Sequence, residues 1–82
     1  MFYIYVLKMN NDQLYIGFTN NLKERIGEHQ NGESFTTKRF LPVKLIYYEC
    51  YFSIKDARKR EKMLKRYGST YSNLKKRIIN SL

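Results

Sequence analysis

Two runs of residues decide the fold of this chain: Phe2-Tyr3-Ile4-Tyr5-Val6-Leu7 and Gln13-Leu14-Tyr15-Ile16-Gly17-Phe18. Both are rich in aromatic and β-branched residues, which favour extended strands. The residues between them, Lys8-Met9-Asn10-Asn11-Asp12, have the composition of a turn. The pattern therefore predicts a β-hairpin with strands over Phe2–Leu7 and Gln13–Phe18.

A helix and a third strand are predicted after the hairpin. The helix runs from Leu22 to Gln30, because Thr19-Asn20-Asn21 supplies N-cap residues and Asn31-Gly32 supplies a stop. A polar, basic loop follows over Glu33–Pro42. The apolar, tyrosine-rich run Val43–Phe52 is predicted as a strand, which we expect to be central or well covered.

Two further helices complete the pattern. The first is predicted from Ile54 to Tyr67, with Ser53 as its cap, Asp56 in the position of a capping box, and Gly68 as its end. The second is predicted from Tyr71 to Ser81. The order β-β-α-β-α-α indicates an α/β fold, a small sheet covered by helices. Because 82 residues leave no room for a second core, we expect one domain over residues 1–82.

The charge of the chain is large and unevenly placed. The formal net charge is +9, from 16 Lys and Arg against 7 Asp and Glu. Residues 1–54 hold six basic against five acidic residues, a net of +1, whereas residues 55–77 hold ten against two, a net of +8. Such a basic segment favours a nucleic-acid partner. The alternative interpretation is a well-hydrated helix surface.

Composition argues against several other classes of protein. No run of about 18 or more apolar residues is present, so we expect no membrane-spanning segment. The first residues lack the basic region and cleavage site of a signal peptide. Cys50 is the single cysteine, so it cannot form an internal disulfide or, with one histidine, a structural zinc site. A reducing, cytoplasmic setting fits this composition.

Polar residues occupy the apolar stripes of the first two predicted helices. On the first, Arg25 and His29 lie on or beside the stripe that must face the sheet. Burying both is costly unless each is satisfied, which points to a purpose. The simpler alternatives are an arginine at the helix edge and a hydrogen-bonded core histidine.

On the next helix, Glu61 is the one carboxylate on the buried stripe, beside Ala57 and Leu64. A lone inward carboxylate in a basic setting is typical of a site for one Mg²⁺ or Mn²⁺ with several waters. The competing explanation is an ion pair within the helix, with Lys65 or Arg58.

The hairpin adds tyrosines to one face of the predicted sheet. Tyr3, Tyr5, Tyr15 and Gly17 share one parity along their strands, so they can share a face. Amphipathic packing explains most sheet tyrosines equally well. A glycine inside a strand marks a bulge or a close approach of another group.

These residues resemble the GIY-YIG nuclease family, in particular its small stand-alone members. Its paired motif is similar to Tyr3-Ile4-Tyr5 followed by Tyr15-Ile16-Gly17, with Tyr3 where the family name has Gly. Arg25, His29 and Glu61 follow in the order and spacing of the family. Further similarity runs through Leu45–Glu49 and Ala57–Lys62, and the late asparagine of the family corresponds to Asn73 or Asn80.

The resemblance implies a mostly antiparallel three-stranded sheet and hydrolysis of a phosphodiester with one divalent cation, giving a 5′-phosphate and a 3′-hydroxyl. Tyr15 is then the general base; because a free phenol ionises near pH 10, Arg25 and the cation must favour its phenolate. Arg25 also holds the phosphate, and Glu61 is the sole protein ligand of Mg²⁺ or Mn²⁺. Tyr5 and His29 orient this set, and Asn73 completes it.

The expected substrate is nucleic acid, DNA in preference to RNA, with no small-molecule cofactor and weak sequence preference. Its backbone is expected to follow basic side chains on the loop and the second helix: Lys38, Arg39, Arg58, Lys62 and Lys65. The first rival hypothesis is a catalytically inactive nucleic-acid-binding module. The second is a surface for protein or anionic membrane, which needs a bulky apolar helix face that Ile54, Ala57 and Leu64 do not supply.

Overall fold

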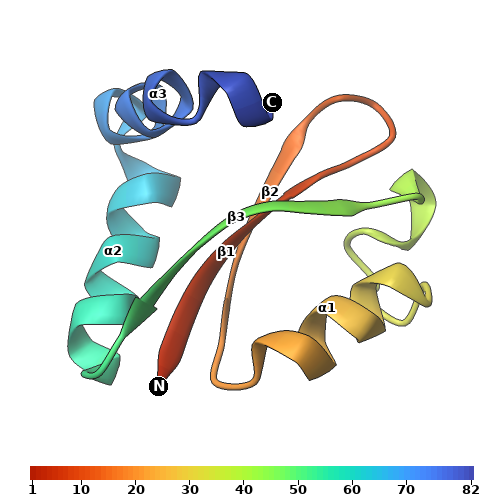
Figure 1. Ribbon diagram of the computed structural model, residues 1–82, viewed down its shortest axis with the longest axis horizontal. Coiled ribbons are helices and arrows are strands. Elements are labelled where there is room, and N and C mark those ends of the chain that lie inside the picture. Colours follow the sequence, from red (N-terminus) through yellow and green to blue (C-terminus); the bar gives the residue numbers. More distant parts are fainter.

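The computed structural model describes all 82 residues as a three-stranded antiparallel sheet with helices on both faces (Figure 1). It confirms the predicted fold class and element order. The elements are β1 (Phe2–Lys8), β2 (Leu14–Thr19), α1 (Leu22–Gln30), the 3₁₀ turn η1 (Lys38–Phe40), β3 (Lys44–Tyr51), α2 (Ile54–Arg66), α3 (Gly68–Arg77) and the 3₁₀ turn η2 (Ile79–Ser81).

Strand β1 is the centre of the sheet, in the order β2-β1-β3. Its residues Ile4 to Leu7 are at most 1% exposed, because neighbours cover them on both sides and both faces. The third strand was expected to be central or well covered, and the first of these alternatives was wrong. β3 lies at an edge, and its long apolar run reflects half-buried tyrosines on a face covered by α2.

Side chains on the two faces of β1 pack into two separate hydrophobic cores. Ile4 and Val6 pack with Ala57 of α2 and with residues of α3, whereas Tyr5 and Leu7 pack with Ile26 of α1. Since alternate residues of a strand point to opposite faces, α1 covers one face of the sheet and α2 with α3 covers the other, as Figure 1 shows. Residues on α1 and α2 can therefore meet only around an edge of the sheet.

Helix α1 has the predicted bounds because its caps are clear: the Asn21 side chain accepts a hydrogen bond from the Glu24 amide at 3.2 Å. The last helix differs from the prediction. α3 begins at Gly68, not Tyr71, because extended Tyr67 is the only residue between α2 and α3. Ser53 occupies the N-cap of α2 without a side-chain bond, and Ile54 is 46% exposed rather than in the core. No helix is long and apolar enough to span a bilayer.

Candidate active site

The phenol of Tyr5 lies across the backbone of the neighbouring strand. Tyr5 of β1 is paired with Gly17 of β2, and a Cβ atom at position 17 would overlap the Tyr5 ring and hydroxyl. Glycine is therefore the one residue that lets this ring lie flat over β2. As a result, a side chain that begins on the central strand delivers its hydroxyl toward the outer edge of the sheet. The close approach expected at Gly17 is confirmed.

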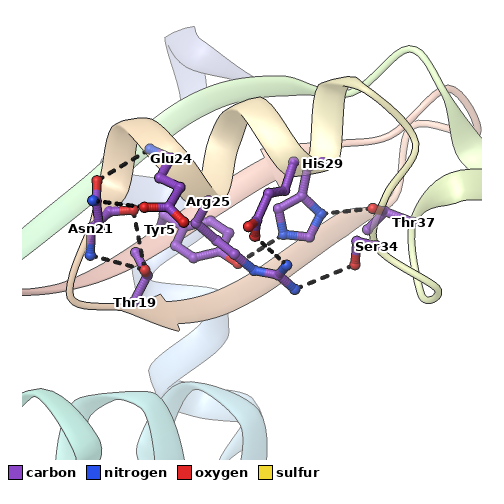
Figure 2. A network of polar contacts seen from close by, with 9 residues as sticks. Tyr5, Thr19, Asn21, Glu24, Arg25, His29, Ser34 and Thr37 are labelled. Atoms are coloured by element: carbon purple, nitrogen blue, oxygen red, sulfur yellow. Dashed lines mark hydrogen bonds and ion pairs between the residues drawn. The ribbon is translucent and has the colours of Figure 1, made fainter.

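Tyr5 begins a buried chain of hydrogen bonds. Its hydroxyl lies 2.8 Å from His29 Nε2, and His29 Nδ1 lies 2.7 Å from the Thr37 hydroxyl (Figure 2). Tyr5 is 1% exposed, and the other two residues are fully buried. The inward placement predicted for His29 is confirmed, and its two ring nitrogens are both satisfied.

The direction of these bonds depends on the tautomer of His29. Each ring nitrogen has one hydroxyl partner, so a neutral ring donates to one of the two hydroxyls and accepts from the other. Burial lowers the pKa of His29, and the positive charge of Arg25 lowers it further, so the ring is neutral.

Arg25 stands beside this chain with part of its guanidinium free. It bonds Glu28 at 3.0 Å and the Ser34 hydroxyl at 3.4 Å, and its side chain remains 32% exposed. The hydrogen bond to Glu28 raises the pKa of Arg25, burial lowers it, and the phenols of Tyr5 and Tyr15 raise it further. In Figure 2 its guanidinium reaches the same side of α1 as the Tyr5 hydroxyl. The exposed part of the guanidinium can accept an anion.

The two tyrosines of the candidate site lie together at edge strand β2. The Tyr5 and Tyr15 rings lie 6.3 Å apart, and Tyr15 lies 5.2 Å from the His29 ring. Burial raises the pKa of the Tyr5 phenol, the nearby Arg25 guanidinium lowers it, and Tyr15 and Glu61 raise it. Glu61 on α2 reaches this edge from the opposite face, because Lys65, which bonds it, lines one hollow with Tyr15. The candidate site therefore lies around β2.

Glu61 is the carboxylate of this site. Its side chain is 16% exposed, and its two oxygens bond Arg58 at 3.1 Å and Lys65 at 3.0 Å. Burial raises the pKa of Glu61, but the bonds from Lys65 and Arg58 outweigh this, so the pKa lies below its ordinary value. The ion pairs posed as the competing explanation are therefore present. Arg58 is also held over the Phe18 ring of β2, 3.7 Å from its centroid.

The donor set around Glu61 fits one hydrated divalent cation. A carboxylate offers about four lone-pair sites, and the two bonds from Arg58 and Lys65 leave the others available. The chain has no cluster of three His, Cys, Asp or Glu side chains suited to a metal. A single carboxylate with waters suits Mg²⁺, which dehydrates reluctantly, better than a cation that needs a full protein cage.

The remaining predicted residues divide into two groups. Lys38 and Arg39 are exposed on η1, and Arg58, Lys62 and Lys65 are exposed on α2, so all five are accessible to a polyanion. Asn73 is not brought to the other catalytic candidates. It lines a separate hollow on α3 with Arg60 and Arg77, on the side of α2 that faces β3.

Two residues that position the candidate site were not predicted from the sequence. Ser34 and Thr37 are buried and hold Arg25 and His29, respectively. They belong to a polar loop in which no periodicity separates an inward hydroxyl from an outward one, and only the spacing from His29 could have hinted at them.

A third missed feature is a second partly buried carboxylate. Glu49 of β3 accepts hydrogen bonds from Tyr47, Tyr51 and both sides of the Arg60 guanidinium. The alternation of Tyr47, Glu49 and Tyr51 on one face of β3 was its signal. This cluster fastens α2 to β3, on the opposite edge of the sheet from Glu61.

Comparison with known proteins identifies the family of the chain. Residues 1–67 match the GIY-YIG catalytic domain. The chain therefore belongs to the GIY-YIG family, a family of nucleases.

The relatives it resembles are called UPF0213 proteins, a name that states no activity. The UPF0213 protein of Clostridium perfringens is 40% identical over 83 residues, 99% of this chain and 85% of that protein. One from Bacillus licheniformis is 38% identical over 65 residues, 78% of this chain and 67% of that protein. The solution structure of a UPF0213 protein from Bacillus halodurans, 24% identical, superposes with a TM-score of 0.58 over 90% of this chain and 81% of that one, which supports the fold alone.

Proposed function

We propose that the protein is a metal-dependent endonuclease that hydrolyses phosphodiester bonds in nucleic acid, DNA in preference to RNA. One observation carries the proposal: Tyr15 on edge strand β2 lies 5.2 Å from the His29 ring on the α1 face and also lines a hollow with Lys65, which bonds Glu61. Phosphodiester hydrolysis needs a cationic group for the phosphate, a base for water and a ligand for the metal ion in one place. We assign these three roles to Arg25, Tyr15 and Glu61.

Arg25 and Tyr15 have separate roles in the proposed hydrolysis. The free part of the Arg25 guanidinium binds the phosphate oxygens and stabilises the charge that grows on them. Tyr15, as the general base, accepts a proton from the attacking water as the water oxygen bonds to phosphorus. The bond between phosphorus and the 3′-oxygen breaks, and that oxygen takes a proton from solvent, leaving a 5′-phosphate and a 3′-hydroxyl.

Tyr5 and His29 act as orienting groups in this scheme. Burial and the charge of Arg25 keep His29 neutral, and both of its ring nitrogens bond hydroxyls, so neither is free to accept a proton from water. Thr37 holds the His29 ring on the side away from Tyr5. His29 is thus a positioning residue rather than a base.

Glu61 would hold the cation, Mg²⁺ or Mn²⁺. Bound there, the cation would supply Lewis-acid stabilisation of the leaving oxygen. Arg58 and Lys65 now bond Glu61 and are about half exposed, so both are free to turn to the substrate backbone. Lys38, Arg39 and Lys62 extend the basic path on either side.

Cleavage assays with matched variants test the proposal. Single-stranded, duplex and branched DNA, with RNA beside them, are incubated with and without Mg²⁺ or Mn²⁺. Wild type should cut only with metal, and Glu61→Gln should lose at least about 100-fold of the rate. Glu49→Gln is the matched control, because Glu49 is equally buried, at 14% exposure, and also paired with an arginine.

The outcomes separate this proposal from the inactive binding module. Nucleic-acid binding that ignores metal, with no product from any substrate, would overturn the nuclease and favour that module. An equal loss of rate in Glu61→Gln and Glu49→Gln would show that only stability had changed.

A further inference from the structure

A hollow of about 360 Å³ lies directly beside the proposed site, at the outer edge of β2. Six residues line it: Leu14, Tyr15, Ile16, Leu64, Lys65 and Tyr71. Two of them connect it to the chemistry, since Tyr15 is the proposed base and Lys65 bonds Glu61 at 3.0 Å. A nucleotide whose phosphate lies between Arg25 and Glu61 must therefore place its neighbour at this hollow.

The lining has the chemistry of a site for a flat ring attached to an anion. Five of the six lining residues are apolar or aromatic, the sixth is a lysine, and none is a carboxylate. A second lysine, Lys75, lies over the Tyr71 ring, 5.3 Å from its centroid. Apolar walls with an aromatic ring favour stacking with a nucleobase, and the two ammonium groups favour the phosphates that flank it.

The other hollows of the molecule do not have this combination. The largest, about 670 Å³, is lined by Tyr3, Leu45 and residues of α1 and includes none of the catalytic candidates. Another is lined by Glu24, Glu28 and Glu33 and would repel phosphate. The last contains Arg60, which Glu49 already engages, and lies on the β3 side.

The backbone of β2, beside the hollow, can distinguish one base from another. β2 is an edge strand, so the backbone N–H and C=O groups on its outer side have no strand partner. Such groups can donate to and accept from the edge of a base. A base that reaches them has left its own pairing partner, as in enzymes that turn a nucleotide out of its stack.

We propose that this hollow binds the nucleobase adjacent to the cleaved phosphodiester, with Leu14 and Tyr71 forming its walls. The inference rests on the proposed nuclease function and adds to it a preference at one nucleotide position. Tyr71 is then a specificity residue that takes no part in bond breaking.

An abasic scan tests this inference on the wild-type protein. Oligonucleotides of one sequence carry a single abasic site at each position around the cut. An abasic site at one position beside the cut should lower kcat/KM roughly 10-fold, mainly by raising KM, because stacking of the base on the walls of the hollow is lost. Equal rates at every position would overturn the proposal, whatever any variant does.

A variant then locates the effect. Tyr71→Leu keeps an apolar side chain but removes the aromatic ring. Its kcat/KM on the intact substrate should therefore fall by the same roughly 10-fold factor. Its kcat/KM on the abasic substrate should equal that of wild type. Tyr71→Phe should behave as wild type. Tyr3→Leu is the matched control, because it makes the same change in the other hollow. If Tyr71→Leu slows both substrates equally, the ring does not contact the base.

The same substrates separate this inference from the nuclease proposal. Binding is measured without metal by fluorescence anisotropy. Base-dependent affinity without cleavage at any metal concentration would overturn the nuclease and keep the base site. Cleavage that is insensitive to the abasic position would do the reverse, and the absence of both would overturn both.

Discussion

Replacing Gly17 by alanine should displace the Tyr5 ring and disrupt the candidate site. The new methyl group would overlap the Tyr5 ring, which is 1% exposed and has no free space to enter. Either the strands shift or the ring leaves its place. Both movements break the hydrogen bond of 2.8 Å between Tyr5 and His29.

The magnitude follows from those two losses. Overpacking in a dense core costs about 1–3 kcal/mol, and a buried hydrogen-bonding group left unpaired costs about 1–3 kcal/mol. Alanine in place of glycine returns roughly 0.5–1 kcal/mol by restricting the unfolded chain. We expect a net loss of about 2–4 kcal/mol in the free energy of unfolding, or a Tm lower by roughly 10–25 °C for a domain of this size.

Thermal melting followed by circular dichroism measures this, with Gly27→Ala as control. Gly27 has open space around its Cβ position inside α1, so the same substitution there should raise stability by about 0.5–1 kcal/mol. In a Tyr5→Leu background, Gly17→Ala should cost little, because the ring is gone. A Gly17→Ala protein that melts within about 2 °C of wild type would refute the argument that the ring crosses β2.

Three further changes have defined outcomes. Thr37→Val should lower the free energy of unfolding by about 1–3 kcal/mol, because His29 loses its buried partner, while Thr37→Ser should restore most of it; urea titration measures both. The pKa of Glu49 is lowered, since the hydrogen bonds from Arg60 and two tyrosines outweigh burial, so its stabilisation is present above its ordinary value of 4.5 and is lost as the pH falls below it. Glu49→Gln should flatten that acid loss in melts from pH 6 to 3, and an unchanged slope would contradict the assignment. Tyr15→Phe should cut the rate of cleavage at least about 100-fold with a change in Tm under about 4 °C, and rapid cutting would remove Tyr15 as the base.

Much of the fold could be predicted because its signals are local. The hairpin is encoded by strand-forming runs around a turn, and α1 by Asn21 at one end and Asn31-Gly32 at the other. The start of α3 could not be predicted, because Gly68 is equally compatible with the end of one helix and the first turn of the next. The edge position of β3 depends on pairing with β1, and a strand sequence does not state on how many sides it is paired.

The candidate site was predictable residue by residue but not as an arrangement. Helical periodicity placed His29 and Arg25 on or beside the buried stripe; His29 is fully buried, whereas Arg25 lies at the edge with its side chain 32% exposed. The same periodicity placed Glu61 on the buried face of its helix. It does not show that α2 covers the face of the sheet opposite to α1. The position of the Tyr5 ring over Gly17 also has no signature in the hydrophobic pattern.

The position of the site on β2 has a consequence for how the molecule associates with others. An open strand edge invites pairing with a further strand, and many proteins block such edges to stay monomeric. In this protein a segment that covered β2 would also cover the site at which the proposed function binds a phosphate. The net charge of +9 offers a substitute, since two such edges repel each other and attract polyanions. High salt or chemical neutralisation of the lysines should therefore promote self-association through the same edge that a nucleic acid would otherwise occupy.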